Sequence, residues 1–178
     1  DPFKKVLGKK GEKEIVWESV FKTNAIPLEI PKKMSTAFAK WLGMLCSRGR
    51  YVEQNGFVGI TTKDESVGKM FDQLTQEVFQ VSTETMQDSR EGRGVFHYII
   101  SKNLVRFLRL FIGPTLMTRR APQQIIEGSL PEQLAFVEGL TLDGYVEQSS
   151  LVVYGGIAKR LAEFSAIVLR LSLIHISE

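Results

Sequence analysis

Apolar and polar positions along the chain follow two spacings, one typical of helices and one typical of strands. Residues 65–79, ESVGKMFDQLTQEVF, carry apolar side chains three and four positions apart, which predicts an amphipathic helix. Residues 57–62, FVGITT, are rich in β-branched and aromatic side chains and follow Asn55-Gly56, a pair that favours a hairpin turn. The pattern therefore predicts an α+β fold in which helices alternate with short hairpins.

The predicted elements occur in the same order twice. A helix, a hairpin, a helix, a hairpin and a helix are expected over residues 35–48, 50–62, 65–79, 79–101 and 102–113. After a connector, a helix (130–142), a hairpin (strands at 145–148 and 151–154) and a helix (156–170) restart the order. The tetrapeptide YVEQ occurs at 51–54 and at 145–148, each time just after a helix that ends in glycine. We therefore interpret the chain as two related halves.

Composition narrows the class of protein. Hydrophobic residues make up 43% of the 178 residues and charged residues 24%, which are ordinary values for a globular domain. A single cysteine excludes an internal disulfide framework, and Cys46 with His97 and His175 is too small a set for a Cys/His zinc site. No apolar run is long enough to span a membrane and no signal peptide is present, so we expect a soluble, cytoplasmic protein.

Charge is distributed unevenly, although the net charge is only +3. Residues 31–50 and 101–120 each contain five basic residues and no acid, whereas residues 121–150 contain five acids and no base. Such basic blocks suit a polyanion such as nucleic acid, and they are equally compatible with solvated helix faces.

Small residues recur four positions apart in both lead helices. The first helix has Ala39, Gly43 and Ser47, and the second has Ala135 and Gly139. Because glycine has no side chain, such a stripe lets two backbones approach closely. We expect these helices to pack side by side on a pseudo-twofold axis.

Three sequence blocks resemble the LAGLIDADG homing endonuclease domains of bacterial inteins. FVEGLTLDGYV (136–146) resembles the LAGLIDADG motif, and WLGMLCSRG (41–49) looks like its first copy. RRAPQQI (119–125) is similar to the K-x-I-P-x-x-I block that precedes the second motif, and EIVWESVF (14–21) resembles a strand of the splicing domain. The resemblance implies a monomer whose two αββαββα halves form a saddle of two sheets over double-stranded DNA.

The resemblance also implies a division of the chain. Residues 1–30 would be a strand and linker from the flanking intein splicing domain, a partner in cis. Residues 31–120 would form the first LAGLIDADG half and residues 121–170 an incomplete, truncated second half. The last eight residues, LSLIHISE (171–178), look like the translation of a sequencing adapter, and we set them aside as a scar.

The family cleaves DNA by magnesium-assisted hydrolysis, with one carboxylate at the end of each motif helix. By resemblance, Asp143 would be the catalytic acid and magnesium ligand of the second motif, and Arg119 would stand where the family has a catalytic lysine. The first motif has no acid between Cys46 and Arg50 in any alignment. A lone carboxylate should hold magnesium poorly, so we expect cleavage to be impaired while DNA binding is kept.

Candidate DNA contacts follow from the expected alternation of the strands. In the first hairpin we expect Val52, Val58 and Ile60 to face inward. The residues expected to face outward, toward DNA, are Tyr51, Glu53, Thr61 and Lys63 of the first hairpin and His97 of the second. The candidate DNA-binding residues are Arg48, Arg50, Tyr51, Glu53, Thr61, Lys63, Arg90, Arg93 and His97.

Two further functions use the same features. The chain could be a non-catalytic DNA-binding or structural passenger of an intein, or an RNA-splicing maturase built on the same fold. The sequence of the outward-facing strand residues does not separate DNA from RNA.

Overall fold

The computed structural model describes residues 28–87, 94–142, 145–147, 150–152 and 158–176 of the chain, and side chains up to residue 142 and from 158 to 172. The strand expected at EIVWESVF (14–21) and the candidates Arg90, Arg93 and Asp143 lie outside the described residues.

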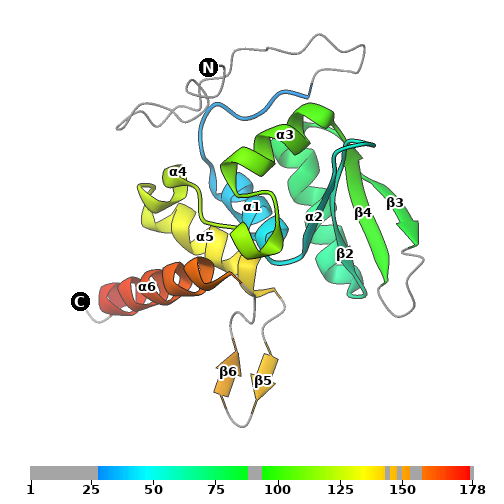
Figure 1. Ribbon diagram of the computed structural model, residues 1–178. Helices are drawn as coiled ribbons and strands as arrows, with labels where there is room; N and C mark the ends of the chain where they lie inside the picture. Colours follow the sequence, from blue (N-terminus) through cyan, green and yellow to red (C-terminus); the bar gives the residue numbers. More distant parts are fainter. Residues whose placement is uncertain (1–27, 88–93, 143–144, 148–149, 153–157, 177–178) are drawn as a thin grey trace.

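The described residues form an α+β fold of six α-helices, a four-stranded antiparallel sheet and a separate two-stranded hairpin (Figure 1). The first half contains α1 (Thr36–Arg48), β1 (Gly49–Val52), β2 (Phe57–Thr62), α2 (Glu65–Phe79), β3 (Glu84–Gln87), β4 (Val95–Ile100) and α3 (Lys102–Phe111). The connector contains a 3-10 turn η1 (Leu116–Thr118) and α4 (Gln123–Ile126), and the second half contains α5 (Leu130–Thr141), β5 (Tyr145–Glu147), β6 (Ser150–Val152) and α6 (Lys159–Ile176).

Short polar side chains fix where the first helices begin. The Ser35 hydroxyl accepts a hydrogen bond from the Phe38 amide at 3.1 Å, and the Asp64 carboxylate accepts one from the Ser66 amide at 2.8 Å. Ser101 caps α3 in the same way. Each cap satisfies an amide that the first helical turn leaves without a partner. The starts of α1, α2 and α3 are therefore encoded locally.

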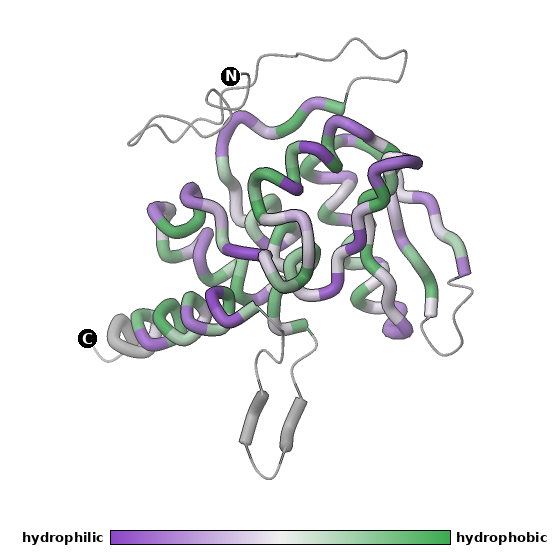
Figure 2. The backbone as a smooth tube through the Cα atoms, viewed as in Figure 1, coloured by the Kyte–Doolittle hydropathy of each residue, from purple (hydrophilic) through white to green (hydrophobic). Residues whose placement is uncertain are grey.

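The four strands lie in the order β1-β2-β4-β3, with α1 and α2 packed on one face of the sheet. Between these two helices the core is aromatic: Trp41 stacks on Phe71 with ring centres 5.8 Å apart and meets Phe79 edge to face at 4.7 Å. The indole nitrogen of Trp41 donates to the Thr75 hydroxyl at 2.9 Å, which satisfies both buried groups. In Figure 2, α1 in the middle of the molecule is largely hydrophobic, as a buried central helix requires.

Helices α1 and α5 pack backbone against backbone at Gly43 and Gly139. A Cβ atom added to Gly43 would lie 2.1 Å from the Phe136 carbonyl oxygen, and one added to Gly139 would lie 2.2 Å from the Lys40 carbonyl oxygen. No side chain fits there, so glycine is required on both helices. The helix contact expected from the small residues is present.

The contact between α1 and α5 is reciprocal. Gly43 approaches Phe136, Gly139 and Leu140, and Gly139 approaches Lys40, Gly43 and Met44. Adding 96, the difference between 43 and 139, to the residue numbers that Gly139 approaches gives the residue numbers that Gly43 approaches. Equal contacts in both directions are the signature of a twofold relation.

A second register relates the hairpins of the two halves. In the first hairpin Tyr51 pairs with Val58 and Val52 with Phe57; in the later hairpin Tyr145 pairs with Val152 and Val146 with Leu151. The difference is 94 at all four positions, and the same difference relates the first residue of α2 to that of α6. The repeat therefore continues through helix, hairpin and helix, with two residues fewer where α5 leads into β5.

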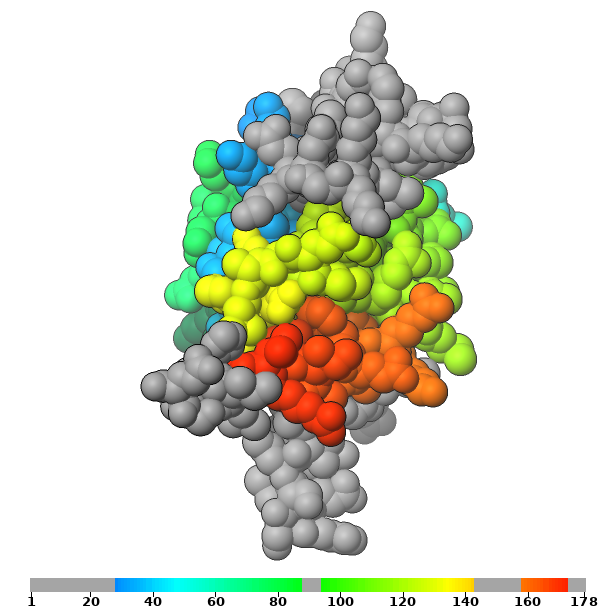
Figure 3. All heavy atoms as spheres, turned by 90° about the vertical axis from the view of Figure 1, so that its left-hand side faces the viewer, coloured from blue at the N-terminus to red at the C-terminus, as the bar shows by residue number. Residues whose placement is uncertain are grey.

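Helices α5 and α6 lie side by side on one face of the molecule (Figure 3). The α6 helix continues through residues 171–176, part of the octapeptide set aside above. None of the described helices is long and apolar enough to cross a membrane.

Candidate nucleic-acid interface

The C-terminal end of α1 is the point at which the first motif would contribute chemistry. The Leu45 carbonyl accepts from the Gly49 amide, the carbonyls after it have no partner within the helix, and all of them can accept from an outside donor. Arg119, from the connector before α4, supplies that donor: Nη1 donates to the carbonyls of Leu45 at 2.5 Å and Cys46 at 3.0 Å, and Nη2 to that of Gly49 at 2.5 Å.

Arg119 is enclosed by this arrangement. Only 4% of its surface is exposed, and its guanidinium lies over the Tyr51 ring, 5.0 Å from the ring centre. A cation at a helix C-terminus is favoured by the helix dipole and by charge-assisted hydrogen bonds. The side chain expected to assist catalysis is thus committed to holding the end of α1, and it does not present its guanidinium to a reacting phosphate.

Arg48, the last residue of α1, is half-buried beside the sheet. Its Nη1 donates to the Thr62 hydroxyl at 2.9 Å. Burial lowers the pKa of Arg48, and the nearby Asp64 carboxylate opposes that shift. An arginine keeps its charge under these conditions, so the end of α1 is cationic.

The described side chains around this helix end do not fit a magnesium ion. Magnesium requires several oxygen ligands, and here two arginines, Arg48 and Arg119, converge on α1. Burial raises the pKa of the Cys46 thiol to about 12, so that group is a neutral thiol and supplies no negative charge for a cation. Within the described ranges, no three His, Cys, Asp or Glu side chains are grouped so that they could hold a metal ion. Asp143 lies outside those ranges.

The two registers of the repeat give three possible counterparts of Asp143 in the first half. A shift of 96, as in the helices, relates Asp143 to Ser47, and a shift of 94, as in the hairpins, relates it to Gly49. The intermediate shift relates it to Arg48. None of these is an acid. The absence of a first-motif carboxylate therefore holds in every register.

The predicted faces of Tyr51, Val52 and His97 are wrong. Tyr51 lies opposite Val58 and packs against the core, because opposite residues of a hairpin share a face. Val52, opposite Phe57, therefore lies on the other face. The burial of Tyr51 raises the pKa of its hydroxyl.

His97 also faces the helices instead of facing outward. It lies opposite the buried Ile60, and its Nδ1 is 3.0 Å from the carboxylate of Asp72 on α2. A Cβ on Gly68 would lie 2.5 Å from the ring, so the imidazole packs directly on the α2 backbone. The sequence suggested the opposite because Phe96 and Tyr98, its neighbours, are buried too.

Phe96 and Tyr98 are buried on the outer face of the sheet, the face away from α1 and α2. Their rings stack with centres 5.1 Å apart, and Phe57 adds a third ring 4.8 Å from Tyr98. The guanidinium of Arg50 lies 5.9 Å from the centre of the Phe96 ring. The Tyr98 hydroxyl donates to Glu84 at 2.9 Å, which raises the pKa of Tyr98. Both faces of this sheet therefore bury apolar side chains.

The remaining candidates lie on or beside this outer face. Arg50 is exposed, Thr61 lies opposite Phe96 and is half-buried, and Lys63 is exposed just after β2. Glu53, in the turn of the hairpin, forms an ion pair with Arg109 of α3. The structure thus brings Arg50 and Thr61 together on one sheet face, with Lys63 just beyond the end of β2.

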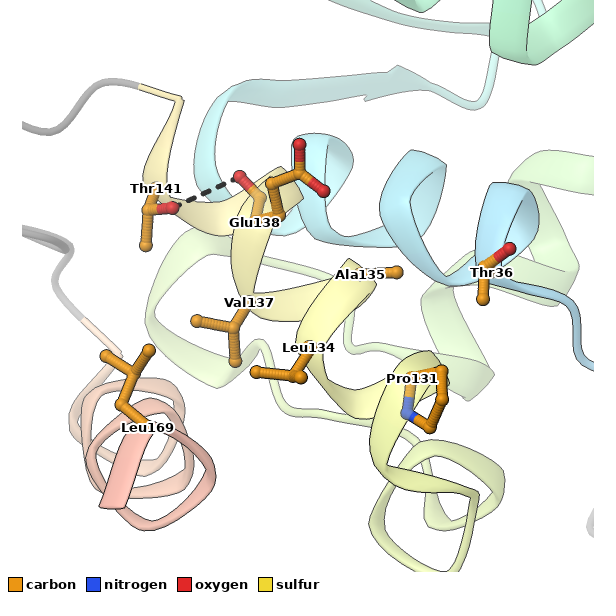
Figure 4. A pocket seen from close by; sticks show the side chains of 8 residues that line it. All are labelled: Thr36, Pro131, Leu134, Ala135, Val137, Glu138, Thr141 and Leu169. Carbon is orange, nitrogen blue, oxygen red and sulfur yellow. Dashed lines mark hydrogen bonds between the residues drawn. The ribbon is translucent and has the colours of Figure 1, made fainter. Parts of the chain in front are cut away.

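A groove between α5 and α6 lies on the helical side of the molecule, with a volume of about 550 Å³. Figure 4 shows Leu134 and Val137 of α5 with Leu169 of α6 along it, and Thr36 of α1 at one end. Because Thr36 and Pro131, at the starts of α1 and α5, lie at the same end, the two helices run in the same direction. We call this depression the α5–α6 groove.

No protein-family model matches the chain, and no curated protein matches it.

Proposed function

We propose that the chain is a double-stranded DNA-binding domain of the LAGLIDADG homing endonuclease type carried by an intein, in which DNA binding is kept and cleavage is impaired. The observation that carries the proposal is the reciprocal contact of α1 and α5 at Gly43 and Gly139. It joins the two sequence blocks that resemble LAGLIDADG motifs at their shared small residue, in helices that run in the same direction.

The order of elements supports the same proposal. Helix, hairpin, helix, hairpin, helix in the first half is the αββαββα order of the family that the motifs resemble. The β5–β6 hairpin and α6 follow α5 in the register of the first half. An internal twofold suits a duplex whose two half-sites are related in the same way.

The surface proposed to meet DNA is the outer face of the four-stranded sheet. The other face is covered by α1 and α2, and strands can present side chains to base edges in the major groove. Arg50 and Lys63 supply positive charge for phosphates, and Thr61 supplies a hydroxyl that can donate or accept. Tyr51 and His97 face away from this surface and are no longer proposed contacts.

Impaired cleavage follows from the charge at the end of α1. A positive charge about 4 Å from a bound cation would oppose it by about 4 kcal/mol per unit charge at an effective dielectric of 20. The burial of Arg119 also favours the non-catalytic form of this proposal.

The test of binding is a salt titration with a mixed-sequence DNA duplex. About six phosphate contacts would give a slope near −5 in a plot of log binding constant against log salt. Arg50→Ala should weaken binding and reduce the slope by about one. Lys69→Ala is the matched control, because Lys69 is exposed on α2 and pairs with Glu65 at 2.7 Å. Affinity that ignores salt, or equal effects of the two variants, would contradict the proposed surface.

The same assay with structured RNA distinguishes the proposed DNA-binding function from the RNA-splicing maturase alternative. The proposed function requires duplex DNA to bind more tightly than an RNA hairpin of the same length. Tighter binding of RNA, with the same dependence on Arg50, would assign the surface to RNA.

The test of cleavage restores the missing acid. The chain and its Arg48→Asp and Ser47→Asp variants are incubated with magnesium and supercoiled plasmid that carries the empty insertion site. We expect little cutting by the unaltered chain and a gain in one variant, which would also identify the register of the motif. Strong cutting by the unaltered chain would contradict the proposed impairment.

A further inference from the structure

A cavity of about 360 Å³ lies at the seam between the two halves, away from the sheet. Its walls come from the end of α3, the connector, α4 and the start of α6, and Figure 3 shows the start of α6 beside the connector. Its lining combines aromatic, amide and basic side chains: Phe111, Arg120, Ala121, Pro122, Gln123, Gln124, Ile126, Arg160 and Phe164. We propose that this cavity binds a nucleotide unit, through its phosphate and its base.

The charge of the cavity favours a phosphate. The two charged side chains that line it, Arg120 and Arg160, are both basic. Arg120 uses one nitrogen to donate to the Leu110 carbonyl at 3.0 Å, which fixes the side chain and leaves further N–H donors. Arg160 makes no hydrogen bond or ion pair with the described part of the chain, and it stands in the first turn of α6, where the helix dipole also favours an anion.

Nearby carboxylates do not neutralise this charge directly. Glu127 accepts a hydrogen bond from the Gln123 side chain at 2.5 Å, and Glu163 pairs with Lys159 at 3.6 Å. Neither acid lines the cavity. Two guanidinium groups from separate elements can therefore converge on one anionic group.

The apolar part of the lining favours a planar group beside that phosphate. Phe111 of the first half is buried against Phe107 and backs the wall, Phe164 of the second half is half-buried, and Ile126 adds an exposed apolar surface. The Phe164 ring is held by an edge-to-face contact with Phe136 at 5.9 Å. Aromatic rings next to arginines are the combination that binds a base and its phosphate together. A volume near 360 Å³ is at the small end of ligand sites and suits one nucleotide unit.

The probes are a nucleoside 5′-monophosphate, the corresponding nucleoside and inorganic phosphate, titrated separately into the whole chain by calorimetry. We expect the monophosphate to bind at least about tenfold more tightly than either fragment, because only it engages both parts of the cavity. A ten-residue single-stranded DNA identifies the source of the nucleotide. Tighter binding of the oligomer assigns the site to a nucleic-acid strand, and equal binding assigns it to a free nucleotide.

Variants separate the two parts of the site. Arg160→Gln and Arg120→Gln should each weaken the monophosphate by about tenfold, and Phe164→Leu should weaken it severalfold without changing inorganic phosphate. Lys159→Gln is the control, since Lys159 is the adjacent exposed cation of α6 and does not line the cavity. Absence of binding at millimolar monophosphate, or binding that neither arginine variant changes, would overturn the proposal. Duplex binding through the sheet should be the same in all four variants, so this test is independent of the proposed function.

Discussion

The two halves of the molecule share the order helix, hairpin, helix and its register, and they differ in what packs between the helices. In the first half Phe38, Trp41 and Thr75 fill the space between α1 and α2 with aromatic rings and one hydrogen bond. At the equivalent positions, 96 and 94 residues later, the second half has Leu134, Val137 and Leu169. Leu134 and Val137 are smaller than the rings at positions 38 and 41, Leu169 offers no hydroxyl in place of Thr75, and all three line the open α5–α6 groove instead of a closed core. The repeat is therefore held by backbone contacts and strand register, while its packing has diverged.

The largest expected difference between the halves is the loss of stability when Trp41 or its counterpart Val137 is truncated. Trp41→Ala should lower the free energy of unfolding by about 3–5 kcal/mol, because it removes a fully buried ring and the indole donor to Thr75, whose hydroxyl keeps only its own bond to the Phe71 carbonyl. Val137→Ala, at the equivalent position, removes two methyl groups beside an existing groove and should cost about 1–2 kcal/mol. Urea unfolding followed by circular dichroism measures both values. Equal losses would mean that the second half is packed as tightly as the first.

Removal of the Arg119 cap is expected to have the next largest effect. Arg119→Met keeps most of the apolar stem but removes the guanidinium donor from the carbonyls of Leu45, Cys46 and Gly49, of which Leu45 keeps the Gly49 amide, at a cost of about 3 kcal/mol. The adjacent Arg120 is exposed and donates to a single carbonyl, so Arg120→Met should cost less than about 1 kcal/mol. Thermal and urea unfolding of both variants provide the measurement. A stable Arg119→Met protein would show that α1 ends without the cap.

The helix contact should respond equally from either half. Gly43→Ala and Gly139→Ala each place a methyl group against a backbone carbonyl of the partner helix, and each should cost about 1–3 kcal/mol. The double variant should cost less than the sum, because separating the helices once relieves both contacts. Unequal single values would break the reciprocity on which the twofold relation rests.

Thiol reactivity compares the ends of α1 and α5 with the smallest change to the protein. Burial raises the pKa of Cys46 to about 12 and covers the thiol, so it should react with a disulfide reagent at pH 8 at least about 100-fold more slowly than in urea. Since its folded pKa is raised, this thiol favours folding below the pKa of the unfolded thiol, near 9, and that contribution is lost as the pH rises above it.

The matched probe is the Cys46→Ala, Leu142→Cys variant, which moves the thiol to the equivalent, half-buried position at the end of α5. It should react much faster than Cys46 in the folded protein. Equal protection of the two thiols would show that the ends of α1 and α5 are equally covered.

Most helices and strands could be predicted from the sequence, because their signals are local. The helix predicted over 65–79 is α2, residue for residue, since Asp64 caps it and its apolar stripe faces the core. The YVEQ repeat and the glycines of the two lead helices likewise indicated two related halves and their contact, because small residues at one spacing have few other reasons to recur.

The direction in which several side chains face, and what they contact, depends on residues that are far apart in the chain. Tyr51 and His97 are turned toward the helices because the strand register, which joins residues far apart in the chain, places them opposite Val58 and Ile60. Arg119 caps α1 because the connector returns to residues 45–49, some seventy positions earlier, and no local pattern encodes that return. Local sequence forms the strand and ends the helix. Which residue packs on a strand face or donates to a free helix carbonyl depends on how distant parts of the chain pack together.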